Sequence, residues 1–337
     1  MEIPYRSLRI ADMMDVSRDI LERICLVKPK EKVVIIGDLT SSLNIIESLA
    51  GACEYIGAEP IVMIIKNPPY PGKYDIPSPV LGAIREADCT IQTTTNSMAH
   101  TEASELAMIK TATRPNGGVW VSMNGVTETN LIKGGIKATG TNRLKKITQK
   151  ATYAITGKTC KITSKMGTNL TFELSGKTFS LWGESTQRPV YHMIPDGESG
   201  NAPVPDSVNG TVVVDGIQEG VIPLRWPYDG PIKYELKDGR VTKIYGSTAA
   251  RIFKKLIFDI GDEGAKYIGE FAVGTNPEAI ITGALQEDKH VLGTIHLSLG
   301  DGLVNRSILH LDGVQLEPTV EIDGRVIIDE GEPIFLK

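Results

Sequence analysis

The strongest chemical signal in the sequence is a histidine and an aspartate two positions apart in an apolar run. His310 and Asp312 lie in SILHLDGVQL, residues 307–316. If this run is a strand, alternate side chains share one face, so the two residues project together with their backbones about 7 Å apart. An imidazole and a carboxylate at this spacing can reach the same divalent cation.

A second histidine lies in a similar run fourteen residues earlier. His296 is in the middle of LGTIHLSLGDG, residues 292–302. If the two runs pair as neighbouring strands, His296 converges with His310 and Asp312. Two imidazoles and one carboxylate are ligands that suit Zn²⁺, Mn²⁺, Co²⁺ or Fe²⁺. The alternative is structural, because a single histidine on an apolar strand is more often a packed core residue.

Two glutamates extend this set. Glu198 lies in a segment with glycines on both sides, which predicts a loop that leads into a strand, and Glu270 lies in the otherwise apolar segment 268–273. A buried carboxylate is costly without a partner, and a bound cation is one such partner. The alternative makes Glu198 a turn residue and pairs Glu270 with Arg251 or Arg306. The predicted donors, sufficient for two metals that share bridging carboxylates, are Glu198, Glu270, His296, His310 and Asp312.

The elements around these residues predict two domains. In residues 1–150, short apolar strands such as KVVIIGD and PIVMII alternate with helices, among them those predicted over residues 12–26 and 102–114, which is typical of an α/β domain with a parallel sheet. The first strand ends in GDLTSS and not in GxGxxG, so a dinucleotide site is not predicted. Residues 151–337 contain many short strand patterns, with Asp-Gly turns in LKDGRV and EIDGRV. This half is predicted to be a mainly antiparallel β (α+β) domain that carries the metal-binding catalytic site.

Composition excludes several classes of partner. The chain has 337 residues and a formal net charge of −5, without an extended basic tract, so no nucleic acid is expected. No apolar run reaches the roughly 18 residues of a membrane span, and the N-terminal residues lack the layout of a signal peptide. Four widely scattered cysteines predict reduced thiols and a cytoplasmic protein.

The sequence resembles the aminopeptidase T and aminopeptidase S group of metallo-aminopeptidases. The resemblance rests on IPDGESGNAPVPDSVNGTVVVDG, IGEFAVGTNP, IHLSLG and LHLDGV, within residues 190–325. Carried over position by position, it implies that the family's two-metal ligands fall on Glu198, Glu270, His296, His310 and Asp312. It further implies Zn, Co or Mn as the metal, a small peptide or amide as the substrate, and a homodimer.

The chain departs from that group in three respects. Leu303 stands where the family has a tyrosine seven residues after the first ligand histidine, LQEDKHVLG replaces an Asn-rich stretch, and the chain is shorter. It is also similar in length and layout to 2,5-dihydroxypyridine 5,6-dioxygenase, a mononuclear iron enzyme that shares the His-x-Asp segment. That enzyme has a histidine at the position of Glu270, and it lacks counterparts of Glu198 and His296.

Three functions follow from these patterns. The main prediction is an aminopeptidase-like hydrolase with metal-activated water, in which Glu198 and Glu270 take part in catalysis. The alternative is a mononuclear non-haem Fe(II) ring-cleaving dioxygenase. The third is a non-catalytic α/β protein whose polar residues are structural.

Overall fold

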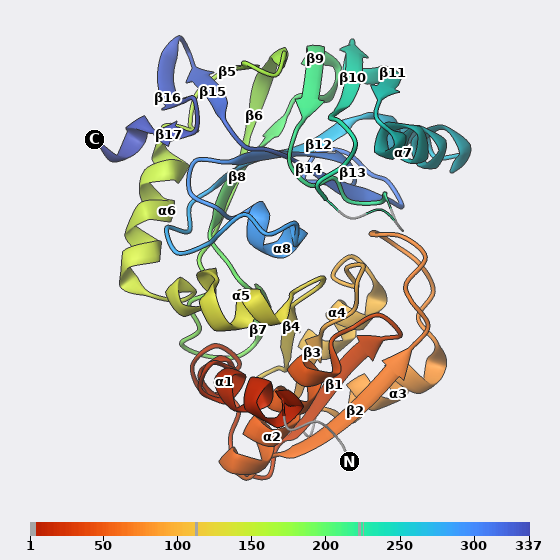
Figure 1. The fold of residues 1–337 in the computed structure, drawn as a ribbon, viewed down its shortest axis with the longest axis vertical. Helices are drawn as coiled ribbons and strands as arrows, with labels where there is room; N and C mark the ends of the chain where they lie inside the picture. Colours follow the sequence, from red (N-terminus) through yellow and green to blue (C-terminus); the bar gives the residue numbers. More distant parts are fainter. Residues whose placement is uncertain (1–4, 112–113, 222–223, 225) are drawn as a thin grey trace. The chain divides into compact units, whose positions relative to one another are not determined.

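The chain forms two compact units, each described here by itself. The structure is a computed structural model that describes residues 5–111, 114–221, 224 and 226–337. The N-terminal unit comprises Met1–Thr141 and Gly183–Asp196, and the C-terminal unit comprises Asn142–Trp182 and Gly197–Lys337 (Figure 1). The segment 183–196 thus returns to the first unit after the second has begun. A domain division at residue 150 stays a prediction, because compactness alone does not show which segments fold independently.

A parallel sheet forms the centre of the N-terminal unit, as the sequence predicts. Its five strands have the order β2-β1-β3-β4-β7, and every pairing is parallel. The strands are β1 (Lys32–Asp38), β2 (Glu59–Ile65), β3 (Cys89–Gln92), β4 (Val119–Ser122) and β7 (Val190–Met193). Sequence analysis did not identify β7, whose four residues are too short a run to show a period.

Helices cover both faces of this sheet. Val33 and Ile35 of β1 pack in one core with α1 (Tyr5–Asp19), α2 (Leu43–Ile56) and α5 (Glu128–Lys133). Val34 and Ile36 pack in a second core with α3 (Ser78–Glu86) and α4 (Glu102–Met108). Alternate residues of a strand point to opposite faces, so a strand covered on both sides is apolar throughout.

Helix ends differ from the sequence prediction at two places. The helix predicted over residues 12–26 continues from α1 into a π-helical turn, Ile20–Ile24. The helix predicted over residues 102–114 ends at Met108, and residues 112–113 of that prediction lie outside the described residues. A 3₁₀ turn, Gly135–Ala138, follows α5.

The C-terminal unit is built on a large antiparallel sheet, which confirms the predicted fold class. All of its strand pairings are antiparallel, and the main path runs β14-β13-β12-β8-β6-β5-β15-β16-β17, with β9, β10 and β11 attached beside it. The strands are β5 (Thr159–Ser164), β6 (Asn169–Leu181), β8 (Glu198–Pro203), β9 (Asn209–Val214), β10 (Ile232–Lys237), β11 (Arg240–Gly246), β12 (Ile268–Gly274), β13 (Ile295–Gly300), β14 (His310–Gln315), β15 (Pro318–Ile322), β16 (Arg325–Asp329) and β17 (Glu332–Pro333).

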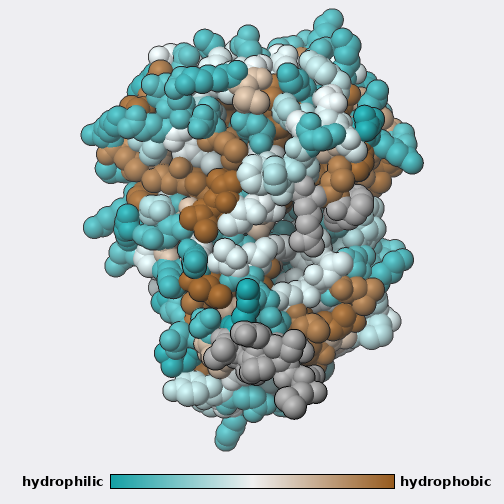
Figure 2. Space-filling view, in the orientation of Figure 1, coloured by the Kyte–Doolittle hydropathy of each residue, from teal (hydrophilic) through white to brown (hydrophobic). Residues whose placement is uncertain are grey.

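Three helices accompany this sheet. They are α6 (Asn142–Ala154), α7 (Thr248–Asp259) and the short α8 (Leu285–Asp288), with 3₁₀ turns at Pro205–Ser207, Glu263–Lys266 and Ile334–Leu336. Across the part of the chain that the structure describes, no helix combines the length and apolar character needed to cross a membrane. Polar side chains cover much of the face shown in Figure 2, with separate apolar patches between them.

The two predicted Asp-Gly hairpin turns are confirmed. Asp238 and Gly239 connect β10 to β11, and Asp323 and Gly324 connect β15 to β16. All four residues have positive φ, between 48° and 79°. Two consecutive residues with positive φ form the tight turn whose twist matches that of paired strands.

The two turn glycines provide a matched stability test. A Cβ on Gly239 would lie 1.9 Å from the carbonyl oxygen of Pro205, whereas a Cβ on Gly324 meets nothing within 4 Å. Gly324→Ala should lower the free energy of unfolding by about 1–2 kcal/mol, the cost of a left-handed L-residue. Gly239→Ala should cost about 1–3 kcal/mol more, because the clash adds to it. Equal losses in urea unfolding would show that the contact with Pro205 does not constrain the turn.

Candidate metal centre

The register of four neighbouring strands places all five predicted donors on one face of the antiparallel sheet. Residues directly opposite each other in an antiparallel pair share a face, as do alternate residues of one strand. The pairs are Glu198 with Gly274, His296 with Ala272, Asp312 with Ser298 and His310 with Gly300, and Glu270 lies two residues before Ala272. The predicted pairing of the two histidine strands is therefore confirmed.

The donor atoms form two overlapping groups of three. Within each group, one donor atom from every residue lies within 4.8 Å of the others. The first group is Glu198, Glu270 and His296, and the second is Glu270, His310 and Asp312. Glu270 belongs to both, so its carboxylate joins the two groups. The structure thus brings the five residues together, although their role as metal ligands stays a prediction.

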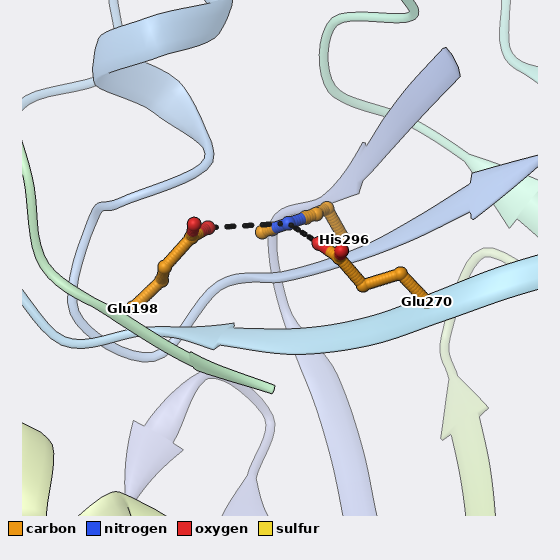
Figure 3. Close-up of side chains that lie close together, drawn as sticks. All are labelled: Glu198, Glu270 and His296. Atoms are coloured by element: carbon orange, nitrogen blue, oxygen red, sulfur yellow. Dashed lines mark hydrogen bonds and ion pairs between the residues drawn. The ribbon is translucent and has the colours of Figure 1, made fainter. Parts of the chain in front are cut away.

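In the first group, the imidazole lies between two carboxylates. His296 Nε2 is 3.3 Å from Glu198 Oε2 and 3.2 Å from Glu270 Oε1 (Figure 3). In the second, His310 Nε2 is 3.2 Å from Asp312 Oδ1. Glu198 is the first residue of β8 and is buried, so the prediction that it lies in a loop is wrong. The positive φ of Gly197 lets the chain turn directly into the strand.

Neither arginine proposed as a partner of Glu270 takes that place. Arg251 donates to Thr248 Oγ1, and Arg306 donates to the Gly302 carbonyl. Glu270 instead faces His296. The purely structural alternative for this glutamate therefore lacks the ion pairs on which it was based.

Three buried residues that sequence analysis did not select lie against the cluster. Lys289 Nζ is 3.1 Å from Asp312 Oδ2 and 3.6 Å from Glu198 Oε2. His290 Nε2 is 3.3 Å from Glu198 Oε2. Ser298 donates a hydrogen bond of 2.5 Å to Asp312 Oδ1. Lys289 and His290 lie in the run QEDKH, whose charges predict an exposed segment, yet all five of its residues are buried.

The charges of this cluster change the pKa of its members strongly. Burial disfavours the ionised form of Asp312, but Lys289 and His310 outweigh that effect and hold its pKa well below the ordinary value. Burial likewise opposes protonation of His310, but Asp312 raises its pKa to about 10. A metal ion that binds His310 must therefore displace a proton.

A further carboxyl group lies beneath the cluster. Glu219 Oε2 accepts a hydrogen bond of 3.3 Å from the backbone N–H of Asp312. Burial, together with the nearby charge of Asp312, raises the pKa of Glu219 to about 8. This side chain is therefore mostly protonated at neutral pH. No sequence pattern pointed to it, because Glu219 lies outside the regular strands.

The donors fit a divalent transition metal. Carboxylate oxygens and imidazole nitrogens suit Fe²⁺, Mn²⁺ and Zn²⁺. Glu198 Oε2 and His290 Nε2 are buried 3.3 Å apart and lack well-formed hydrogen bonds, so a cation would supply the partner that each needs. His310 Nδ1 lies 2.9 Å from the Asp301 carbonyl oxygen, a contact of the kind that orients metal-ligating imidazoles.

Arg188 and His192, which precede Glu198 in the chain, have structural contacts in the N-terminal unit. Arg188 donates through two nitrogens to the carboxylate of Glu31. His192 Nε2 is 2.9 Å from Ser185 Oγ. These contacts stabilise the segment that carries β7.

The fold and the buried cluster are those of an enzyme with a candidate metal centre. The family model for NicX, 2,5-dihydroxypyridine 5,6-dioxygenase, matches residues 12–334. The chain belongs to this family. A comparison with curated proteins gives no match.

Two solved structures share the fold. The 2,5-dihydroxypyridine dioxygenase from Pseudomonas putida KT2440 superposes with a TM-score of 0.72 at 15% identity, over 96% of this chain and 97% of that one. AmpT from Thermus thermophilus superposes with a TM-score of 0.64 at 13% identity, over 96% and 99%. The resemblance to the aminopeptidase T group is thereby supported as a related fold.

The prediction of an aminopeptidase-like hydrolase is wrong. The family match over nearly the whole chain and the higher similarity to the dioxygenase structure overturn it. The five donor residue types did not distinguish a hydrolase from a dioxygenase, because a metal site on a shared fold can serve different reactions. The departures at Leu303 and in the LQEDKHVLG stretch were the more informative signals.

Glu270→Gln should abolish tight metal binding. The substitution keeps the shape of the side chain but removes the carboxylate that joins both groups of donors. Loss of a second-shell partner alone typically weakens metal affinity roughly 10- to 100-fold, so loss of this ligand should exceed about 100-fold. Competition with a chromogenic chelator for Mn²⁺ measures the change. The matched control is Glu278→Gln, at an ion pair with Arg143. Equal affinity in Glu270→Gln and the unmodified protein would exclude Glu270 as a ligand.

Proposed function

We propose that this protein is a mononuclear non-haem Fe(II) dioxygenase that opens the ring of a dihydroxypyridine or a closely similar hydroxylated N-heteroaromatic compound. The observation that carries the proposal is the match of the 2,5-dihydroxypyridine 5,6-dioxygenase family model to residues 12–334. The buried cluster of carboxylates and imidazoles supports it, because these donors suit ferrous iron.

The second group of donors is the preferred place for the iron in this proposal. Glu270, His310 and Asp312 offer one imidazole and two carboxylates, with His296 next to Glu270. Bound ferrous iron supplies the one-electron chemistry that allows O₂ to react with an aromatic ring. The contact of His310 Nδ1 with the Asp301 carbonyl and that of Ser298 with Asp312 fix the orientation of two of these side chains.

Glu198 is the proposed hydrogen-bond acceptor for a ring hydroxyl. Its Oε2 atom is buried, and nitrogen atoms of Lys289, His290 and His296 surround it. These groups hold the pKa of Glu198 well below its ordinary value against the opposing effect of burial. The carboxylate is therefore ionised at neutral pH, so it can accept a hydrogen bond from the hydroxyl and orient the ring, but it is too weak a base to take the proton.

Activity with O₂ tests the function directly. The protein, reconstituted anaerobically with Fe(II), should consume one O₂ for each 2,5-dihydroxypyridine consumed, with loss of the aromatic absorbance. With ¹⁸O₂, both labelled atoms should enter the ring-opened product. Zn²⁺-loaded protein is the control and should be inactive, because zinc has no redox chemistry. Ring loss without O₂ uptake, or incorporation of a single labelled atom, would contradict a dioxygenase.

Asp312→Asn should reduce both the iron content and the activity. The amide keeps the size of the side chain but removes the negative charge that Lys289, His310 and Ser298 contact. We expect a decrease of at least about 100-fold in kcat/KM, equivalent to roughly 3 kcal/mol. Asp206→Asn, at an exposed position in a 3₁₀ turn, is the matched control. Normal iron content and activity in Asp312→Asn would remove this residue from the centre.

Two further expectations accompany this function. The partner is a small aromatic molecule rather than a nucleic acid or a membrane. The homodimer rests on the resemblance to aminopeptidases of this fold, and sedimentation velocity on the full chain tests it.

A further inference from the structure

We propose that the ammonium group of Lys289 takes the place of a second metal cation in the centre and thereby restricts it to one divalent cation. This inference rests on the metal site of the proposed function. It assigns a role to a residue that lies outside the predicted ligand set.

Lys289 connects the two groups of donors, as Glu270 also does. Glu198 belongs only to the first group and Asp312 only to the second. Lys289 Nζ contacts both, at 3.6 Å from Glu198 Oε2 and 3.1 Å from Asp312 Oδ2. A pair of metal ions would need these same two carboxylates, one for each ion, about 3.5–4 Å apart. The ammonium would then lie close to both ions and repel them.

The charge balance of the predicted ligand set leads to the same conclusion. Its three carboxylates, Glu198, Glu270 and Asp312, contribute three negative charges. With Lys289, one divalent cation neutralises them. A second divalent cation would leave an excess of two positive charges in a buried site, which is costly in a low dielectric.

The position of Lys289 is set by the backbone and is not that of a flexible surface lysine. The residue directly follows α8, and its backbone N–H donates to the carbonyl groups of Leu285 and Glu287. Its side chain is only 4% exposed. The backbone thus fixes the point from which the Lys289 side chain enters the cluster. A long side chain that is buried and held in this way does not easily move out to solvent.

Removal of the ammonium leaves donors for a second ion. Glu198 Oε2 and Asp312 Oδ2 would lose their shared partner. His290 Nε2 is buried and lies 3.3 Å from Glu198 Oε2. His290 Nδ1 lies 2.8 Å from the Gln286 carbonyl oxygen, an arrangement that orients Nε2 toward the cluster. Glu198 and His290, 3.3 Å apart, therefore offer two donors where the lysine was, and Asp312 loses the same ammonium contact.

Metal stoichiometry tests the inference without reference to catalysis. Metal-free full-length protein is titrated with MnCl₂ and analysed by elemental analysis and electron paramagnetic resonance. The unmodified protein should bind one Mn²⁺ per chain, with an isolated six-line signal. Lys289→Met should bind two, with a spin-coupled signal, and the double variant K289M/H290A should return to one. Lys289→Arg keeps the charge and should bind one.

Controls and outcomes separate this inference from the proposed function. Lys266→Met, at an ion pair with Glu263 outside the cluster, should bind one Mn²⁺. Failure of the unmodified protein to bind Mn²⁺ or Fe²⁺ would overturn the metal centre itself. Two ions in the unmodified protein, or a single ion in folded Lys289→Met, would overturn the role of Lys289 while the centre stands. If Lys289→Met does not fold, as judged by circular dichroism, Lys289→Gln replaces it. The number of Mn²⁺ ions bound by the unmodified protein tests the role of Lys289 in either case.

Discussion

The structure depends on the cost of burying charge on one face of a β-sheet. Three carboxylates from β8, β12 and β14 share that face, and removing such groups from water costs several kcal/mol each unless cations compensate. The protein compensates in part by itself. Lys289 and the imidazole groups contact the carboxylate oxygens, and Ser298 donates to one of them. A divalent metal would complete the balance, so the same electrostatic requirement explains both the buried lysine and the expected cofactor.

The remainder of the C-terminal unit holds this face in place. On the opposite side, β12 and β13 present apolar residues such as Val273 and Leu297, and Phe271 of β12 packs edge-on against Phe172 of β6. A shift of register by one residue would exchange the two faces, placing the charges in the apolar core. The geometry of the cluster is therefore specified by hydrophobic packing on the far side of the sheet. The fold and the cluster are specified by the same pattern of residues.

Sequence alone predicted the parallel and antiparallel halves, the two Asp-Gly turns and the convergence of the donors, because these depend on local periodicity. His310 and Asp312 are two residues apart on a strand, and this spacing is sufficient to place them together. It did not predict β7 or the start of a strand at Glu198, which depend on pairing with distant segments. Lys289 was missed for a related reason. A charged run normally indicates exposure, and only tertiary contacts show that this one is buried. The predicted reaction class was wrong because the types of donor residue alone do not define which reaction a site catalyses.

The most direct test of the account is the position of iron in crystals of the protein grown with Fe(II) under anaerobic conditions. Anomalous difference maps recorded above and below the iron absorption edge should show one peak per chain within bonding distance of the Glu270 carboxylate. That peak should also lie within bonding distance of at least one of His296 and His310. Iron bound elsewhere would contradict a metal centre built on these strands. So would the absence of any peak, provided that elemental analysis of the same protein in solution finds one iron per chain.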